Sequence, residues 1–263
     1  TKTEQSDLMQ ALYGRNGESP SVVLASSTPG NCFDWAYMSS KITLEHNTPV
    51  VLLSDGYLGN GAEPWKIKST LDMPEIHPSI AIEGEEYQPY ARNKETLARK
   101  LALPGTKGLE HRLGGLEKED VTGNVSYDAE NHEKMVGIRA EKIKRIANII
   151  PNQEIFGEEK GDLLVVGWGG THGSLYSVVD SLLKQGKKIA LCQFNYINPL
   201  PKNTSEIFKQ YKQIIVCELN SGQFANYLRI NFQGTIFHQY NKIQGFPFTT
   251  IELESHFKTL LSK

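Results

Sequence analysis

The sequence predicts an α/β fold with two domains and mostly parallel sheets. Short apolar runs bounded by turn residues alternate with longer amphipathic stretches, which is the pattern of βαβ units. The clearest run, at residues 49–53, stops abruptly in a glycine-rich turn, as a buried parallel strand does. A long irregular stretch separates two such regions, and we assign the domains to residues 1–130 and 131–263.

In the first region, residues 21–26 are expected to form a strand, 31–47 a helix and 48–53 the next strand. A strand, a helix and a strand joined by tight links make a βαβ unit, so the sheet should be parallel. Within the irregular stretch we expect one short helix at 95–103. Residues 104–131 hold few apolar side chains and should form a binding loop, a lid or a linker.

The second region is expected to begin with a helix at 131–149. Met135, Ile138, Ile146 and Ile149 share roughly one face of it, and Pro151 stops it. Strands and helices then alternate, which indicates a second α/β domain. The expected strands are 162–166, 188–192, 213–218 and 234–238, and the expected helices are 174–185 and 221–230.

Composition argues against several classes of protein. The net charge of −2 lacks the basic excess of a nucleic-acid binder. No apolar run approaches the about 18 residues of a membrane span, and no signal peptide opens the sequence. The cysteines Cys32, Cys192 and Cys217 are far apart and never in C-x-x-C spacing, which excludes a four-cysteine metal site within this chain. Unpaired cysteines in apolar runs favour a cytoplasmic location.

A glycine-rich turn at 167–173 follows one strand and opens a helix, which is the setting of a phosphate-binding helix N-terminus. The dinucleotide pattern needs glycines at its first, third and sixth positions, and counted from Gly167 the sixth is His172. The acidic residue expected after the next strand is missing, because Cys192, Gln193 and Phe194 stand there. We therefore interpret the segment as a tight turn and disfavour a nicotinamide-binding protein.

Two places carry side chains suited to binding. Glu110, His111 and Arg112 lie in the long loop, where they could close over an anionic substrate or remain solvated. Asp55 and Glu63 flank a strand end, where a carboxylate binds a hydroxyl or a metal, although Asp before Gly also makes turns. The seven histidines form no H-x-x-x-H pair, and no G-x-S-x-G motif occurs, so neither a histidine metal site nor a hydrolase triad is expected.

Several short segments occur in an order and spacing that are specific when taken together. They are residues 1–8 (TKTEQSDL), 12–18 (LYGRNGE), 48–65, 104–117, 123–128, the turn at Gly167, and 195–201 (NYINPLP). With these segments the whole chain resembles the alpha subunit of 2-oxoacid:ferredoxin oxidoreductases, and most of all that of the 2-oxoglutarate enzyme.

The resemblance implies part of a thiamine-diphosphate pyrimidine-binding domain over 1–130, followed by a transketolase-C-like domain over 131–263. It implies thiamine diphosphate and magnesium shared with or held by a beta subunit, which also carries an iron–sulfur cluster, with no metal on this chain. The implied reaction removes carbon dioxide from a 2-oxo acid, gives the acyl group to coenzyme A and passes electrons to ferredoxin. The cofactor is the electron sink, and the protein supplies position and electrostatics.

The family pattern has more sequence ahead of Thr1, including a glutamate that activates the cofactor and an arginine that grips the substrate. We therefore expect this chain to be a C-terminal part that is inactive alone, and no catalytic residue transfers to it. The resemblance suggests Thr1, Lys2 and Thr3 as substrate neighbours, with His111 and Arg112 second. A cationic Lys2 would favour the distal carboxylate of 2-oxoglutarate over the methyl group of pyruvate.

Two alternatives stay open. Within the same enzyme class, the substrate could be pyruvate or a branched-chain 2-oxo acid. In a different class, the chain could be a non-catalytic docking subunit whose loops serve only the beta subunit.

Overall fold

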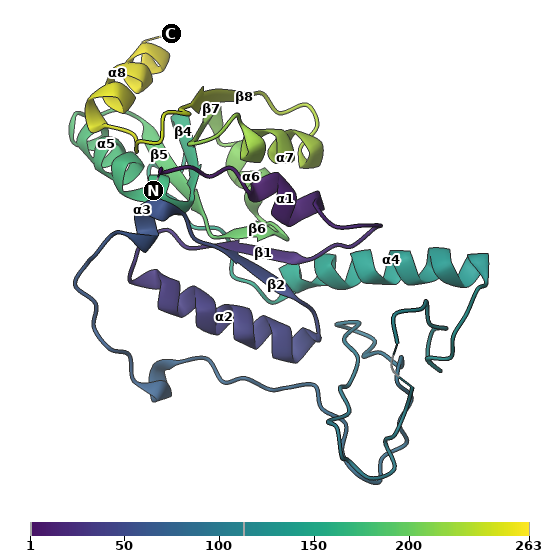
Figure 1. The fold of residues 1–263 in the computed structure, drawn as a ribbon. Coiled ribbons are helices and arrows are strands. Elements are labelled where there is room, and N and C mark those ends of the chain that lie inside the picture. The colour runs from purple at the N-terminus through teal and green to yellow at the C-terminus, as the bar shows by residue number, and fades with distance from the viewer. Residues whose placement is uncertain (1, 113, 263) are drawn as a thin grey trace.

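The computed structural model describes residues 2–112 and 114–262 and shows an α/β fold with two sheets (Figure 1). The predicted fold class is confirmed. The smaller sheet contains β1 (Val22–Ala25), β2 (Val50–Leu53) and β6 (Tyr196–Asn198). The larger contains β3 (Phe156–Gly157), β4 (Gly161–Trp168), β5 (Ile189–Phe194), β7 (Tyr211–Glu218) and β8 (Phe237–Asn241).

Helices of both types connect these strands. The α-helices are α1 (Leu8–Tyr13), α2 (Asn31–His46), α3 (Gly56–Gly59), α4 (Ala129–Arg145), α5 (His172–Lys184), α6 (Thr204–Phe208), α7 (Gln223–Asn231) and α8 (Thr250–Leu261). The 3-10 helices are η1 (Thr70–Asp72), η2 (Ile146–Asn148) and η3 (Gly169–Thr171).

The smaller sheet has the order β2-β1-β6. β1 and β2 pair in parallel around α2, as the predicted βαβ unit requires, whereas β6 runs antiparallel to β1. Ile42 of α2 and Ile143 of α4 pack with Val22 and Leu24 of β1 in one buried cluster. β6 comes from the second half of the sequence, and α4 begins at Ala129 and runs across the predicted boundary, so both halves of the chain contribute to this layer. The division at residue 130 stays a prediction.

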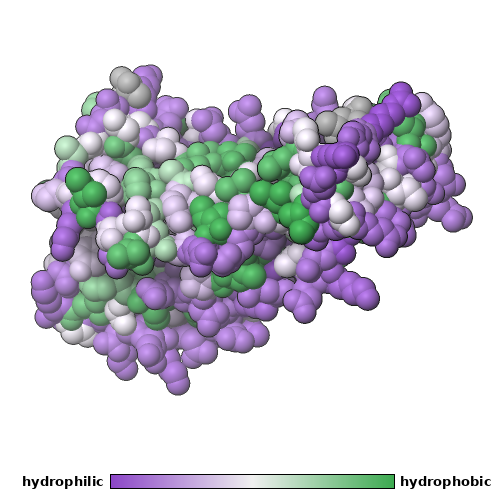
Figure 2. All heavy atoms as spheres, turned by 90° about the horizontal axis from the view of Figure 1, so that it is seen from below, coloured by the Kyte–Doolittle hydropathy of each residue, from purple (hydrophilic) through white to green (hydrophobic). Residues whose placement is uncertain are grey.

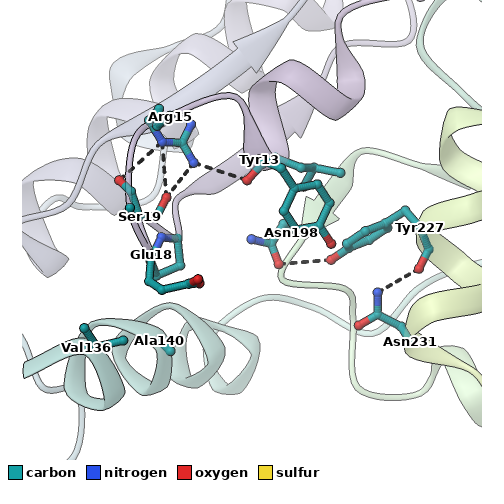
Figure 3. A pocket seen from close by; sticks show the side chains of 12 residues that line it. Tyr13, Arg15, Glu18, Ser19, Val136, Ala140, Asn198, Tyr227 and Asn231 are labelled. Carbon is teal, nitrogen blue, oxygen red and sulfur yellow. Dashed lines mark hydrogen bonds between the residues drawn. The ribbon is translucent and has the colours of Figure 1, made fainter. Parts of the chain in front are cut away.

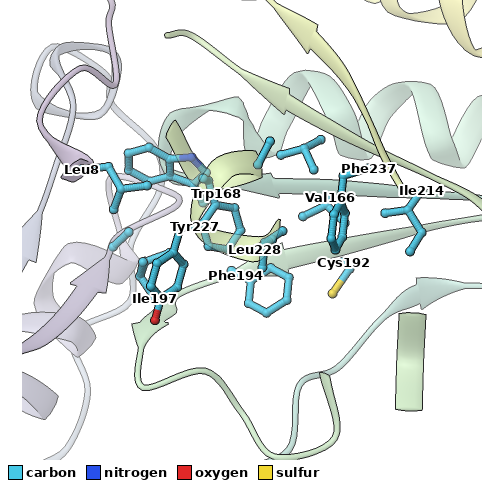
Figure 4. Close-up of a cluster of buried hydrophobic side chains, with 14 of the residues drawn as sticks. Leu8, Val166, Trp168, Cys192, Phe194, Ile197, Ile214, Tyr227, Leu228 and Phe237 are labelled. Carbon is cyan, nitrogen blue, oxygen red and sulfur yellow. The ribbon is translucent and has the colours of Figure 1, made fainter. Parts of the chain in front are cut away.

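The larger sheet has the order β3-β5-β4-β7-β8 and is parallel except for the edge strand β3. Successive residues of β4 point to opposite faces, as the period of a strand requires. Leu163 and Val165 pack in the cluster that includes α5 and α8. Leu164 and Val166 pack on the other face with α7 and α1, in a core that also takes side chains from β1 (Figure 4).

The predicted helix at 131–149 is present as α4 and η2. Met135 and Ile146 are buried as expected, but Ile149 is half exposed because it follows the end of η2. Other predicted elements are shifted by a few residues, and the last strand lies at Phe237–Asn241 instead of 234–238. The sequence analysis did not identify α8, β3 or β6.

The predicted short helix at 95–103 is wrong. The Asn93 side chain accepts hydrogen bonds from the backbone N–H groups of Glu95 and Thr96 and closes a turn there. Leu97 takes a left-handed conformation with φ of 59°, which ends any helical path. Short polar side chains compete with helix formation in this way.

The described residues of the segment 60–128 form one 3-10 helix and isolated bridges but no ladder. It runs beneath α2 and then forms a lobe below α4 (Figure 1). Figure 2 shows the face that α2 and this segment present, on which apolar side chains gather among polar ones. Ile67 and Leu71 of this segment are 80% and 93% exposed. None of the helices in the described part of the chain is long and apolar enough to cross a membrane.

Candidate functional site

Asp55 links two loops, one at the carboxyl end of β2 in the smaller sheet and one at the carboxyl end of β4 in the larger sheet. Its Oδ1 accepts hydrogen bonds from the N–H groups of Tyr57 and Leu58 and so caps α3 at the end of β2. Its Oδ2 accepts from the N–H of Gly170, at 2.6 Å, in the glycine-rich turn after β4. A Cβ atom on Gly170 would lie 2.5–2.9 Å from this carboxylate, so the turn approaches closely because it has no side chain there. Two motifs that the sequence analysis treated separately therefore meet.

Glu63 holds the next loop against the start of α2. Its Oε1 accepts a hydrogen bond from Thr28 Oγ1, at 2.7 Å, and another from the N–H of Gly30. A Cβ on Gly30 would collide with this carboxylate. Both oxygens of Asp55 and Oε1 of Glu63 thus bind the chain itself, as is typical of residues that shape loops.

Between these two anchors lies a cleft of about 530 Å³. Its walls come from the loop after β2, from the turn before α2 and from the amino-terminal segment. Thr3, Pro29, Gly56, Tyr57, Asn60, Gly61, Ala62 and Glu63 line it. The lining is mostly neutral and contains backbone, hydroxyl and amide groups. Such a cleft suits the uncharged part of a small molecule better than a phosphate or a metal ion.

The usual ligand crevice of the larger sheet is filled by Gln5. In open α/β sheets ligands bind where the strand order reverses, which here is between β4 and β7. Gln5 Nε2 donates to the carbonyl of Trp168 at 2.7 Å, and its Oε1 accepts from the N–H of Leu219 at 2.9 Å. Because Gln5 occupies both strand ends, this crevice is not open to a ligand.

Glu218, at the end of β7, is a buried carboxylate that the sequence analysis missed. Four donors reach it: Trp168 Nε1, Asn220 Nδ2 and the N–H groups of Phe224 and Ala225. Burial raises the pKa of Glu218 above its ordinary value, and these hydrogen bonds act in the opposite direction. The group ties α7 to the end of the sheet. Its only sequence signal is an acid that directly follows an apolar strand.

The candidate substrate neighbours lie in two separate places. Thr1 is outside the described residues. Thr3 lines the cleft and donates from its N–H to the carbonyl of Gly245 at 3.3 Å, while the stem of Lys2 lies against Gly245. Lys2 is exposed at this edge.

His111 and Arg112 belong to the lobe below α4, which lies away from α3 in Figure 1. The Nδ1 atom of His111 is 2.9 Å from the carbonyl of Leu109, and its ring contacts Tyr87; Arg112 is exposed. Glu117 fastens the same lobe to α4 through ion pairs with His132, at 2.8 Å, and Arg139, at 3.3 Å. Within this chain, His111 and Arg112 are therefore not brought to the cleft.

A second cavity, of about 380 Å³, lies between α4, α7 and the turn after α1 (Figure 3). Arg15 lines it but donates to the carbonyls of Ala11, Leu12 and Ser19, so its guanidinium holds the turn in place. Across the cavity, Tyr227 donates from its hydroxyl to Asn198 Oδ1 at 3.0 Å. The motif at 12–18 therefore has a structural explanation.

Among the described residues, no group of three or more His, Cys, Asp or Glu side chains is arranged to hold a metal ion. Cys192 and Cys217 are buried in the larger sheet, and burial raises the pKa values of both thiols.

Comparison with known proteins identifies the relatives of this chain. Residues 1–131 match the family described as "Pyruvate flavodoxin/ferredoxin oxidoreductase, thiamine diP-bdg". Those residues include the cleft, Asp55, Glu63 and the whole lobe below α4.

Over its full length the chain is 42% identical to the 2-oxoglutarate oxidoreductase subunit KorA of Mycobacterium tuberculosis, of which it spans 40%. It is 27% identical to the 2-oxoacid:ferredoxin oxidoreductase subunit alpha of Saccharolobus solfataricus, of which it spans 42%. The resemblance stated from the sequence is confirmed. The chain thus spans about two fifths of the length of these relatives.

A solved structure, the 2-oxoglutarate:ferredoxin oxidoreductase of Magnetococcus marinus with 2-oxoglutarate, coenzyme A and succinyl-CoA bound, superposes with a TM-score of 0.89. The match covers 99% of this chain and 46% of that one, at 26% identity. The arrangement of both sheets is therefore that of this enzyme family.

Proposed function

We propose that this chain is part of the alpha subunit of a thiamine-diphosphate-dependent 2-oxoglutarate:ferredoxin oxidoreductase. The enzyme decarboxylates a 2-oxo acid oxidatively, transfers the acyl group to coenzyme A and passes the electrons to ferredoxin. The observation that carries the proposal is the 42% identity, over the whole chain, to a 2-oxoglutarate oxidoreductase subunit. The superposition on a 2-oxoglutarate:ferredoxin oxidoreductase supports it.

The cleft lined by Thr3, Tyr57 and Asn60 fits the uncharged end of thiamine diphosphate, since it offers neutral polar groups and close backbone. When bound, that cofactor supplies an electron sink for decarboxylation. The role of this chain is to position one side of it. Asp55 and Glu63 fix the two loops that form the walls, and their anchoring hydrogen bonds keep the cleft preorganised.

The partner is a beta subunit, to which we assign the magnesium and diphosphate site and the iron–sulfur cluster. Exposed apolar side chains gathered on the face of α2 and the segment beneath it support a partner there (Figure 2), and Ile67 and Leu71 of that segment are among the exposed large apolar residues. We place the assembly in the cytoplasm.

Substrate contacts in this chain are proposed for Thr1, Lys2 and Thr3, of which Thr3 lines the cleft and Thr1 is outside the described residues. His111 and Arg112 would reach the substrate only if the lobe below α4 met the site in the assembly. Pyruvate or another 2-oxo acid is the alternative substrate. A docking subunit without catalytic side chains is the second candidate, favoured by the loop contacts made by both oxygens of Asp55 and by Oε1 of Glu63.

The test uses the complete alpha subunit that contains this chain, co-expressed with its beta partner. Coenzyme-A-dependent reduction of a viologen dye is followed with 2-oxoglutarate and, separately, with pyruvate. Reduction with 2-oxoglutarate and little with pyruvate is expected. Reduction with pyruvate alone would reject the substrate, and reduction with neither, from an assembled complex, would reject the proposed reaction with these two acids.

A further inference from the structure

We propose that a third cavity, between the end of β1 and the end of β5, binds an amino-substituted nitrogen heterocycle of the adenine type. The cavity has a volume of about 510 Å³, within the range of small-molecule sites. It shares no lining residue with the cleft of Thr3 and Glu63. The proposal goes beyond the function given above and does not depend on it.

The cavity lies where α/β proteins bind ligands. Ser27 lies just after β1, Gln193 is the second-last residue of β5, and His172 opens α5 after the glycine-rich turn. Ligands of such sheets sit outside the carboxyl ends of the strands. Since Gln5 fills the crevice between β4 and β7, the β5 side of the larger sheet is the side that stays open.

The side chains of the lining offer no positive charge to attract an anion. None of the described residues that line the cavity is Lys or Arg, and Glu154 is its one carboxylate. Burial lowers the pKa of His172 below its ordinary value, although the charge of Glu63 opposes this, so the ring is neutral near pH 7. A phosphate or carboxylate ligand would therefore find no positive partner, whereas a neutral or weakly basic ring meets no repulsion.

The remaining side chains suit a flat heterocycle. Trp35, Phe156 and Tyr196 supply aromatic surface, and ring stacking of this kind holds nucleobases in many proteins. Amide oxygens can accept a hydrogen bond from the amino group of adenine, while the amide nitrogens of Gln153, Gln193 and Asn195 already donate to the chain. Four amides line the cavity: Asn152, Gln153, Gln193 and Asn195.

Two of the lining groups have hydrogen-bonding capacity that the chain does not use. Gln193 donates through Nε2 to the carbonyl of Gly169, at 3.2 Å, but its shielded Oε1 has no partner among the described residues. The same is true of His172 Nδ1. Unpaired shielded polar atoms are uncommon in native structures and call for an explanation. The terminal torsion of Gln is soft, so a small rotation would offer Oε1 to an amino group in the cavity.

The experiment measures binding of adenosine, cytidine and uridine to the protein as the cell makes it, by isothermal titration calorimetry up to about 5 mM, where even weak ligands register. Adenosine should bind, and uridine, which carries a carbonyl in place of the amino group, should bind at least about ten-fold more weakly. Cytidine, which carries an amino group as adenosine does, should bind with an affinity similar to that of adenosine. Equal affinity for adenosine and uridine, or no binding of adenosine, would overturn the proposal.

Variants locate the site. Gln193→Met and Trp35→Leu should each weaken adenosine binding at least about ten-fold, the loss expected when a stacking or edge contact is removed. Tyr127→Ala, at an exposed position far along the chain, is the matched control and should change nothing. If Trp35→Leu lowers the melting temperature strongly, Phe156→Leu on another wall replaces it. Displacement of adenosine by thiamine would show a cofactor site and would also overturn the proposal. The assay needs no turnover, so its failure leaves the proposed reaction untouched.

Discussion

Gln5 and Trp168 are joined by a hydrogen bond of 2.7 Å, from Gln5 Nε2 to the Trp168 carbonyl, although 163 positions separate them. The backbone of Gln5 pairs with the segment after β7, since its N–H donates to the Leu219 carbonyl at 3.1 Å. The amino-terminal segment is therefore fixed by hydrogen bonds between the ends of β4 and β7. These hydrogen bonds of Gln5 hold Thr3 and Lys2 at the edge of the cleft.

Gln5→Ala should lower the free energy of unfolding by about 2 kcal/mol, because it leaves the Leu219 N–H buried and unpaired and removes one of the two donors of the Trp168 carbonyl, which keeps Thr171 Oγ1. Chemical denaturation measures the change. Gln10→Ala is the matched control, because Gln10 is exposed, and should cost less than about 0.5 kcal/mol. A loss for Gln5→Ala no larger than that of the control would contradict the role of this anchor.

Glu218→Gln should alter how stability depends on pH. Burial raises the pKa of Glu218 in the folded protein above its ordinary value of 4.5, so between these two values the folded state binds more protons than the unfolded state. The contribution of Glu218 to stability is thus fully present below pH 4.5 and declines as the pH rises through the folded value. Gln has no such dependence. The stability of Glu218→Gln relative to wild type should therefore rise with pH above 4.5, and a difference that stays flat from acid to neutral pH would refute this.

Lys142 gives the opposite dependence. It is largely buried, and burial, helped by Arg99 and Arg92, lowers its pKa to about 8 from 10.5. Between these values the unfolded state binds more protons, so stability should rise with pH from about 8 to 10.5. The shift corresponds to about 3 kcal/mol at neutral pH. This exceeds the about 1 kcal/mol expected for the hydrogen bond from Lys142 Nζ to the Asn47 carbonyl at the end of α2.

Lys142→Met should therefore be at least as stable as wild type at pH 7, and should lose this advantage as the pH approaches 10. Thermal denaturation across that range is the measurement. Lys144→Met, at an exposed position of the same helix, serves as the control and should follow wild type at every pH. Identical pH profiles for Lys142→Met and wild type would show that Lys142 is not desolvated.

Much of the fold could be predicted because local pattern and tertiary environment agree. The apolar runs that form β1, β4 and β7 are buried on both faces, and such continuous apolar runs are typical of strands in parallel sheets. The strand β6 has only three residues, and its pairing with β1 depends on the path of the whole chain, which no local signal encodes. The helix α8 carried a readable signal, since Thr249 and Glu252 form a capping box ahead of Leu253, Phe257 and Leu260.

The candidate site was less accessible to prediction. The turns at 54–56 and 167–173 were both identified, but their contact through Asp55 and Gly170 joins two sheets and follows from packing alone. His111 and Arg112 were chosen by chemical type, and the ion pairs of Glu117 hold their lobe on α4 instead. Residue type indicates what a side chain can do, while the distance to the cleft depends on contacts made elsewhere.

Gly170→Ala should separate the two sheets at their contact point. The new Cβ would lie 2.5–2.9 Å from the Asp55 carboxylate, so the N–H to Oδ2 hydrogen bond must lengthen, at a cost of about 1–3 kcal/mol. In the assembled enzyme, turnover should fall as well, because the wall of the cleft moves. Gly173→Ala is a matched control, since a Cβ there meets nothing within 4 Å and the residue lies in α5. That variant should keep or slightly raise stability, and equal effects of the two variants would rule out the clash as the cause.

Lys2→Ala tests the proposed basis of substrate preference. The anchor at Gln5 and the contact of Thr3 with Gly245 hold the stem of Lys2 beside the cleft, where its ammonium would attract the distal carboxylate of 2-oxoglutarate. In the complete enzyme, the ratio of kcat/KM for 2-oxoglutarate to that for pyruvate should fall about ten-fold, equivalent to about 1.4 kcal/mol of transition-state stabilisation. The activity with pyruvate should stay unchanged, because its methyl group gains nothing from the charge. Lys66→Ala removes a lysine from the segment beneath α2 and should leave the ratio intact. A ratio that Lys2→Ala does not change would assign the preference to residues other than Lys2.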